Sequence, residues 1–496
     1  MSADAGTVAP AERTSWSSGM APAYIGTLLW VAFFDGIGRR ALPMGGLGPS
    51  LLGVLAGSIL AYLLVYRVTA SWGFAAGRPL DGVSASTFGV RGALVIPNLL
   101  IALGQVGLFA VGIGYGTELM LDGLLTLGLI EPQVVGPARW GGAVVPSPLF
   151  LACAMAWGLV VALVGLWIVR WIAAIMRYFP VFPAAGLALA VAGGLTGLRS
   201  FRPPGIDPMT GGILAIGEGA RLAFLTTFQW TFGFLSLLGI AGADWGAASL
   251  SQGDVRKGGW FSVAFVPLVV ASLAMLAVVG HEGKVQDRLE ASSEIIRAGT
   301  GAPGAAPSTK LDPTVAQGRY TFRSAVIEGG FDRRVNAAIL IVFGLASFAP
   351  ACFAAYEFGR RLSSVAPGFS KPAWTLIGVA SGWFLIVVGW FDRTELVFSI
   401  LGGLFAPVAG AIAADSARRF RAGWPGPRPG INMAGIIAWT LGAAVGLAPI
   451  IARAVGSEGL AKVAPASLLA FVAAFLTYLL AAAIGLESRN EILATD

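Results

Sequence analysis

Residues 30–42 read WVAFFDGIGRRAL, and this stretch decides how the rest of the chain is interpreted. It is apolar at its start and then places one acid (Asp35), two glycines and two arginines within a few residues. An ionisable side chain at bilayer depth costs at least about 2.5–3.5 kcal/mol on insertion scales, so such residues usually face a cavity or each other. Glycine also weakens a helix by about 1 kcal/mol relative to alanine. The stretch is therefore typical of a broken membrane helix that lines a site.

The composition of the whole chain is that of a membrane protein. Of the 496 residues, 56% are hydrophobic and 12% are charged, and the mean hydropathy is +0.77. Surface-to-volume scaling leaves a soluble fold too little interior to hide this much apolar surface. The apolar runs are also longer than the strands of about 10 alternating residues that build membrane barrels. These features exclude a soluble enzyme and a disordered or fibrous chain, and they predict an all-α polytopic membrane protein that lies in a lipid bilayer.

About twelve apolar runs are long enough to cross a bilayer. They fall at about 22–44, 48–70, 93–120, 147–170, 177–198, 220–243, 259–280, 335–358, 372–390, 394–414, 430–453 and 464–486. With the N-terminus in the cytoplasm, Lys and Arg are enriched in the short cytoplasmic segments, as the positive-inside rule requires. We therefore predict a multi-pass protein of the plasma (inner) membrane with both termini in the cytoplasm. The net charge of +7 follows from this bias, and no nucleic-acid partner is expected.

A second interrupted stretch, LLGIAGADWG at 237–246, lies in the sixth span. Breaks in spans 1 and 6 have the spacing of a five-helix unit used twice, and an odd number of spans inverts the second copy. Inverted repeats with broken helices in matching places are typical of secondary transporters. We predict two inverted five-helix repeats, spans 1–5 and 6–10, and two peripheral helices. The predicted segments are a polar cytoplasmic tail (1–20), the first repeat (21–200), the start of the second repeat (201–280), an extracytoplasmic loop (281–334), the rest of the second repeat (335–425), and spans 11–12 with the C-terminal tail (426–496).

Asp35 is the main candidate for binding a cation, a proton or a polar group of a substrate. On an intact helix Asp35 and Arg39 would share a face, because residues four apart are neighbours. The alternative interpretations are that the two side chains neutralise each other structurally, or that Arg39 and Arg40 extend to the outer surface of the membrane.

A coupling-ion site is predicted where the first span meets the eighth. Pro350 removes the helix hydrogen bond to the carbonyl of Ala346, which would then be free to bind a cation. Ser347 offers a hydroxyl beside it, and Asp35 would supply a carboxylate. Na⁺ or H⁺ is the expected coupling ion, although a serine in a membrane helix more often bonds to its own backbone.

Several motifs together resemble the nucleobase–cation symporters of the purine–cytosine permease type. They are GRPL at 77–80, STFGVRGA at 86–93, GLFAV at 107–111, GADW at 242–245, GRRLSSVAP at 359–367 and LGGLFAPVAGAIAAD at 401–415. The resemblance covers about residues 20–430 and implies a five-plus-five inverted-repeat transporter fold. It also implies a substrate wall on span 3, where Leu108 and Gly112 replace a stacking tryptophan and a glutamine. Trp230 and Phe234 on span 6 could still supply an aromatic wall, or they could be packing residues.

The substrate site predicted from the residues and the resemblance consists of Asp35, Gly36, Leu108, Gly112, Trp230, Phe234 and Gly239. We expect a secondary active transporter for a small polar or heterocyclic compound such as a nucleobase. An amino-acid or amine carrier on the same fold remains an alternative, as does a sensor or scaffold that no longer transports. A lone histidine and two distant cysteines make a metal site improbable, and no cofactor is expected. The spans carry no Ser/His pair or paired carboxylates for catalysis, so we do not expect an enzyme.

Overall fold

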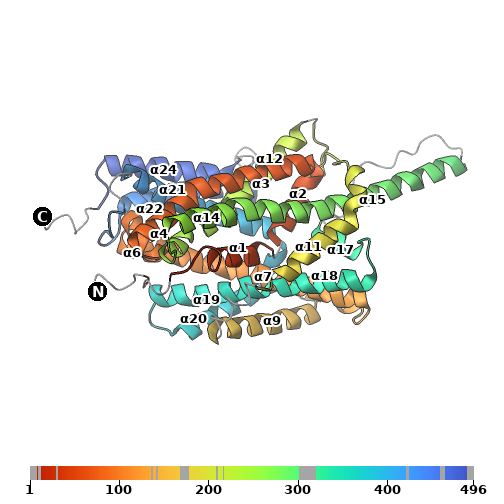
Figure 1. The fold of residues 1–496 in the computed structure, drawn as a ribbon, viewed down its shortest axis with the longest axis horizontal. Helices are drawn as coiled ribbons and strands as arrows, with labels where there is room; N and C mark the ends of the chain where they lie inside the picture. The colour runs from red at the N-terminus through yellow and green to blue at the C-terminus, as the bar shows by residue number, and fades with distance from the viewer. Residues whose placement is uncertain are drawn as a thin grey trace.

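The computed structural model is a bundle of helices that run along one long axis (Figure 1). It describes residues 8, 13–29, 32–135, 138–140, 143–167, 178–207, 211–215, 217–300, 320–419, 424–457 and 464–488. Within these residues ten helices are long and apolar enough to cross a membrane, and a bent pair of helices adds an eleventh. With the shorter apolar helix Lys371–Val387, they match the predicted runs one for one. The chain is a multi-pass helical membrane protein.

Many spans consist of several consecutive helical elements. The first part of the chain forms α1 (Met20–Leu28), α2 (Ala32–Gly45), α3 (Leu47–Leu60), η2 (Ala61–Tyr66), α4 (Arg67–Ala76), α5 (Leu80–Phe88), α6 (Val90–Ala93), η3 (Leu94–Leu99), α7 (Leu100–Leu127), α8 (Pro132–Val135), the antiparallel strands β1 (Ala138–Trp140) and β2 (Ala143–Val145), α9 (Pro148–Trp167), α11 (Val181–Gly194) and η4 (Leu195–Arg199). The second part forms α12 (Glu218–Ile240), α13 (Gly242–Ala247), α14 (Gln252–Gly259), η5 (Trp260–Phe265), α15 (Val266–Thr300), α17 (Phe322–Ile327), α18 (Arg333–Ala346), α19 (Phe348–Val365), α20 (Lys371–Val387), η6 (Trp390–Asp392), α21 (Thr394–Arg418), α22 (Met433–Ala454) and α24 (Ala466–Ala483).

The first four spans of the first predicted repeat pack against the spans at equivalent positions of the second. The first span contacts the sixth through α2 and α12, and the second contacts the seventh through α3 and α15. The third span (α7) packs on both halves of the eighth (α18 and α19), and the fourth (α9) packs on the ninth (α20). The last two spans, α22 and α24, pack on each other and on α21. The fifth span (α11) instead packs mainly on α15, and the tenth (α21) packs on α12, so the repeat arrangement stays a prediction.

The first span is broken, but upstream of the predicted position. Helices α1 and α2 meet at an angle of 49° between Leu28 and Ala32, and Trp30 and Val31 lie outside the described residues. Asp35 and Gly36 instead fall inside α2, with Asp35 in its first turn. An acid is stabilised there because a helix N-terminus carries a partial positive charge. Gly36 serves close packing, since a Cβ on it would lie 2.8 Å from Thr394 Oγ1.

The sixth span is interrupted between the glycines that the sequence singles out. Helix α12 ends at Ile240, Ala241 forms a turn, and α13 begins at Gly242. Further along α13, Gly246 contacts the second span so closely that a Cβ on it would lie 2.0 Å from the carbonyl oxygen of Ala70. Gly73 makes the reciprocal contact: a Cβ on it would lie 2.1 Å from the carbonyl oxygen of Ala243. The two glycines therefore allow α4 and α13 to touch through their backbones.

Gly73→Ala should lower the free energy of unfolding by about 1–3 kcal/mol, because the added methyl group overpacks this contact. The matched control is Gly48→Ala in α3, where a Cβ meets nothing within 4 Å. That change should be neutral or slightly stabilising, since alanine is the better helix former by up to about 1 kcal/mol. Thermal melting of the two purified variants in detergent checks the prediction, and equal melting temperatures would contradict it.

The predicted loop 281–334 contains more helix than the sequence analysis assigns to it. Helix α15 continues past the predicted end of span 7 to Thr300, and α17 forms before α18 begins at Arg333. Residues 301–319 lie outside the described part of the chain. The extended helix protrudes from the bundle beside α17 (Figure 1). We call this end of the bundle the α17 end, and the opposite end, where α6 lies, the α6 end.

Candidate functional site

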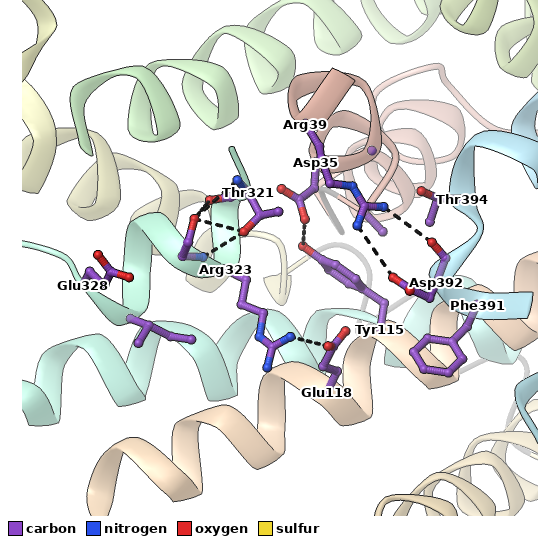
Figure 2. A pocket seen from close by; sticks show the side chains of 14 residues that line it. Asp35, Arg39, Tyr115, Glu118, Thr321, Arg323, Glu328, Phe391, Asp392 and Thr394 are labelled. Atoms are coloured by element: carbon purple, nitrogen blue, oxygen red, sulfur yellow. Dashed lines mark hydrogen bonds and ion pairs between the residues drawn. The ribbon is translucent and has the colours of Figure 1, made fainter. Parts of the chain in front are cut away.

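A cavity of about 270 Å³ lies where α2 meets α7, α17 and the segment that joins η6 to α21. It is lined by Ala32, Asp35, Gly36, Arg39, Tyr115, Glu118, Thr321, Arg323, Ser324, Ile327, Glu328, Phe391, Asp392 and Thr394. Most of these side chains are polar, and they include both acids and bases (Figure 2). Two of the predicted substrate residues, Asp35 and Gly36, belong to this lining.

Asp35 is buried, with 9% of its surface exposed, and both of its carboxylate oxygens accept hydrogen bonds. The backbone N–H of Phe322 donates to Oδ1 at 2.5 Å. The hydroxyl of Tyr115 donates to Oδ2 at 3.1 Å, as Figure 2 shows. Asp35 on the first span thus connects the third span to α17.

The start of α17 has a local sequence reason. Thr321 is its N-cap, and its hydroxyl accepts a hydrogen bond from the backbone N–H of Ser324 at 3.0 Å. The side chain of Ser324 accepts one from the backbone N–H of Thr321 in return, at 3.3 Å. The first N–H groups of a helix lack partners within it, and that of Phe322 is bonded to Asp35. The capping pair therefore sets the direction of the donor that Asp35 receives.

Arg323 holds α17 against the third span. Its guanidinium pairs with Glu118 and with Asp122, one turn apart on α7, and donates to Asp122 Oδ1 at 2.8 Å. Burial lowers the pKa of Arg323, but the two carboxylates outweigh burial and raise that pKa above its ordinary value. Arg323 is therefore a permanent cation at this contact.

Arg323→Ala should loosen α17 and expose the hydrogen bond that Phe322 makes to Asp35. Hydrogen bonds to charged groups contribute about 1.5–3 kcal/mol each, so the amide of Phe322 should exchange at least about tenfold faster with solvent deuterium. The control is Arg334→Ala, because Arg334 is exposed on α18 and does not line the cavity. An unchanged exchange rate at Phe322 in the Arg323 variant would show that other contacts hold α17.

Arg39 and Arg40 connect α2 to the start of the tenth span. Arg39 pairs with Asp392 at 3.6 Å, and Arg40 pairs with Glu395 at 3.0 Å. The side chain of Asp392 is 73% exposed, and exposed pairs at such a distance contribute little, about 0–1 kcal/mol. The alternative interpretation of Arg39 as a partner of Asp35 is therefore not what the structure shows: Arg39 bonds to the side chain and the backbone carbonyl of Asp392.

A separate ionic network lies toward the α6 end. Arg361 on α19 is buried and donates to Glu357 at 2.9 Å, to Asn98 at 2.8 Å and to Asp244 at 3.1 Å. Asp244 also accepts the backbone N–H of Leu80 at 2.8 Å. This network ties α13, which follows the break in the sixth span, to the third and eighth spans and to α5.

The other predicted substrate residues lie outside the lining of the cavity. Phe234 packs in an aromatic cluster: its ring centroid lies 4.6 Å from that of Phe33 and 5.1 Å from that of Phe398. Trp230 and Gly239 are buried on α12, and a Cβ on Gly239 would meet Val65 at 2.7 Å. Leu108 and Gly112 lie on α7, where Gly112 is buried and Leu108 packs against the main apolar core. Their role in binding stays a prediction.

Ser347 and Ala346, predicted as coupling-ion ligands, do not line the cavity with Asp35. Ser347 separates α18 from α19, so the eighth span is interrupted next to Pro350. Its hydroxyl donates to the carbonyl of Gly344 at 2.7 Å and accepts from Trp157 Nε1 at 3.2 Å. Such bonding to its own helix is the alternative that the sequence analysis leaves open. A cation at this position stays a prediction. Among the described residues, the structure has no group of three or more His, Cys, Asp or Glu that could hold a metal ion.

Sequence reasoning missed much of the lining. Tyr115, Arg323, Asp392 and Thr394 were not predicted, because they come from segments far from Asp35 in the chain. One signal was available: Glu118 and Asp122 are acids four apart within an apolar span. At bilayer depth such a pair requires a cation, and Arg323 supplies it.

Comparison with solved structures identifies the fold. Mhp1, a nucleobase-cation-symport-1 family transporter, in a closed conformation with bromovinylhydantoin bound, matches with a TM-score of 0.57 at 16% identity over 99% of this chain and 98% of that one. The inward-facing conformation of Mhp1 matches with a TM-score of 0.60 at 17% identity, over 99% and 96% of the two chains. The substrate-bound outward-open state of a Na⁺-coupled sialic acid symporter matches with a TM-score of 0.54 at 11% identity, over 96% and 92%. No protein-family model matches the sequence, and no curated protein matches it. The resemblance indicated by the sequence motifs is thus confirmed for the fold, and this chain shares the architecture of a nucleobase-cation-symport-1 family transporter.

Proposed function

We propose that this protein is a secondary active transporter that moves a small polar compound through the cavity around Asp35 by alternating access. The observation that carries the proposal is the position of Asp35. It is a buried carboxylate next to the break in the first span, and it faces a cavity large enough for a small molecule. An ionisable residue at this depth is by default a functional candidate.

The contacts at the two ends of the bundle support alternating access. At the α17 end, Arg323 and Phe322 hold α17 against the third and first spans, and Arg40 holds the start of α21 against the first span. At the α6 end, Arg361 holds α13 against the third and eighth spans. Each set consists of ion pairs and hydrogen bonds that can break without the other. In our proposal the α17 end faces outside and the α6 end faces the cytoplasm, in accordance with the predicted orientation.

Coupling to a cation fits the charge of the cavity. Its lining holds four carboxylates, those of Asp35, Glu118, Glu328 and Asp392, and two guanidiniums, those of Arg39 and Arg323. A positive charge that enters with the substrate would offset this excess of negative charge. Two of the similar structures are a nucleobase-cation-symport-1 family transporter and a Na⁺-coupled sialic acid symporter, so we propose Na⁺ or H⁺ as the driving ion.

The test is uptake into liposomes that contain the purified protein. A panel of nucleobases, hydantoins, allantoin, amino acids and amines is offered with an inward Na⁺ gradient, an inward H⁺ gradient or neither. We expect at least one compound to accumulate above its outside concentration, and to leak out when an ionophore removes the gradient. A compound that stabilises the protein in detergent but never enters the liposomes would instead support a sensor or scaffold. Equal uptake with and without every gradient would contradict secondary active transport.

A further inference from the structure

Asp35 accepts hydrogen bonds on both oxygens, from the backbone N–H of Phe322 on Oδ1 and from the hydroxyl of Tyr115 on Oδ2. A carboxylate has about four lone-pair sites, so about two remain for another donor. Within the described residues, no Lys, Arg or His nitrogen lies within 4.0 Å of these oxygens.

The groups that reach Asp35 suit a hydrogen-bond donor better than a metal cation. An alkali cation requires several oxygen ligands at once, but the nearest partners of Asp35 are an N–H and an O–H that point toward it. An ammonium group instead needs two or three separate acceptors, because it carries only donors. Asp35 is one acceptor of this kind on the cavity wall.

Thr394 supplies a second acceptor. It is buried, with 4% of its surface exposed, and among the described residues its hydroxyl has no hydrogen-bond partner. It lines the same cavity (Figure 2). A Cβ on Gly36, the residue after Asp35, would lie 2.8 Å from Thr394 Oγ1, so the hydroxyl is next to this part of α2. A buried hydroxyl without a partner is costly, and it is satisfied if a ligand donates to it.

We propose that the substrate carries a protonated amino group, which binds between the carboxylate of Asp35 and the hydroxyl of Thr394. This inference rests on the proposed transporter function and names the substrate class of the same site. Each cation in the lining has an acidic partner: Arg323 is paired with Glu118 and Asp122, and Arg39 is paired weakly with Asp392. Amines and amino acids share this chemistry. An amino acid would also need a cation for its carboxylate, and Arg39 could supply it by exchanging its weak contact with exposed Asp392.

The test uses matched sets of three compounds on the purified full-length protein in detergent, with thermal stability and titration calorimetry as readouts. Each set contains an amino acid, its amine without the carboxylate and its acid without the amine, from glycine, methylamine and acetate up to leucine, 3-methylbutylamine and 4-methylpentanoate. Uracil and hydantoin represent neutral heterocycles. We expect an ammonium-bearing member of at least one set to raise the melting temperature and its matched acid not to. Binding of both the amino acid and the amine would assign recognition to the ammonium alone, and binding of the amino acid alone would add Arg39.

Three variants locate the ammonium group. Asp35→Asn should lower the affinity for the ammonium probe at least tenfold. Thr394→Val, which keeps the shape of the side chain but removes the hydroxyl, should lower that affinity several-fold. Asp332→Asn is the control, because Asp332 caps α18 outside the cavity and asparagine caps equally well. If Asp35→Asn does not fold, Thr394→Val alone carries the test. Failure of every ammonium probe, or an unchanged affinity in both cavity variants, overturns the inference. A heterocycle that binds in that case leaves the proposed transporter function standing.

Discussion

Arg428→Met is expected to lower the free energy of unfolding by about 3–5 kcal/mol, which is the typical effect of breaking a buried ion pair from one side. The side chain of Arg428 is fully buried and donates to the carbonyl of Ser86 at 2.5 Å, to the hydroxyl of Tyr478 at 2.7 Å and to Asp415 at 3.2 Å. It also pairs with Glu487. Its partners therefore come from α5, from the tenth and twelfth spans and from the segment after α24. Methionine leaves the fully buried carboxylate of Asp415 without its main cation.

Two further variants separate lost charge pairing from lost packing. Arg418→Met removes a contact to the same Glu487 at 2.6 Å, but the side chain of Arg418 is 35% exposed, so the expected loss is about 0–1 kcal/mol. Asp415→Asn in the Arg428→Met background removes the orphaned charge, while the hydroxyls of Ser86 and Thr87 can still reach the side chain. The double variant should therefore melt at a higher temperature than Arg428→Met alone. If it does not, the effect of Arg428 lies in packing and not in charge.

The spans could be predicted from sequence because a membrane helix is one continuous apolar segment, whose backbone hydrogen bonds are satisfied within the segment. Every run from 22–44 to 464–486 has a helical counterpart. The position of the first break could not be predicted as well. Glycines and an acid weaken a helix, but α2 continues through Gly36, which packs against Thr394, some 350 residues away in the chain. Glycines on the sixth span lie closer to the actual interruption at Ala241.

The site could be predicted only at the residue that conflicts with its surroundings. Asp35 stands out because a carboxylate is costly in an apolar segment, and it does face a cavity. The rest of the lining is set by tertiary contacts. Phe322 contributes its backbone N–H, which any residue has, and Thr394 contributes a hydroxyl that is unremarkable in sequence. The exception is the pair of acids Glu118 and Asp122, whose position in an apolar span predicts a nearby cation.

Asp35→Asn should reduce uptake into liposomes by about 10- to 100-fold, whichever gradient drives it. A hydrogen bond to a charged group contributes about 1.5–3 kcal/mol, and about 1.4 kcal/mol corresponds to a factor of ten. The amide of asparagine has the shape of the carboxylate, but it carries no charge, and its NH2 group replaces one of the two oxygens that accept from the N–H of Phe322 and the hydroxyl of Tyr115. Asp332→Asn, outside the cavity, should transport as the unaltered protein does. Normal accumulation in Asp35→Asn would remove Asp35 from the mechanism.

Exchange of labelled for unlabelled substrate in the absence of any gradient distinguishes the two roles that Asp35 could have. If Asp35 only carries the coupling proton, asparagine imitates its protonated form, and exchange should persist while gradient-driven uptake is lost. If Asp35 binds the ammonium group of the substrate, both processes should fail together, because each requires an occupied cavity. We expect the second result, since Asp35 lines the cavity beside the buried hydroxyl of Thr394, which has no hydrogen-bond partner among the described residues. Asp35→Glu keeps the charge and should restore part of the exchange, which would attribute the loss in Asp35→Asn to charge and not to misfolding.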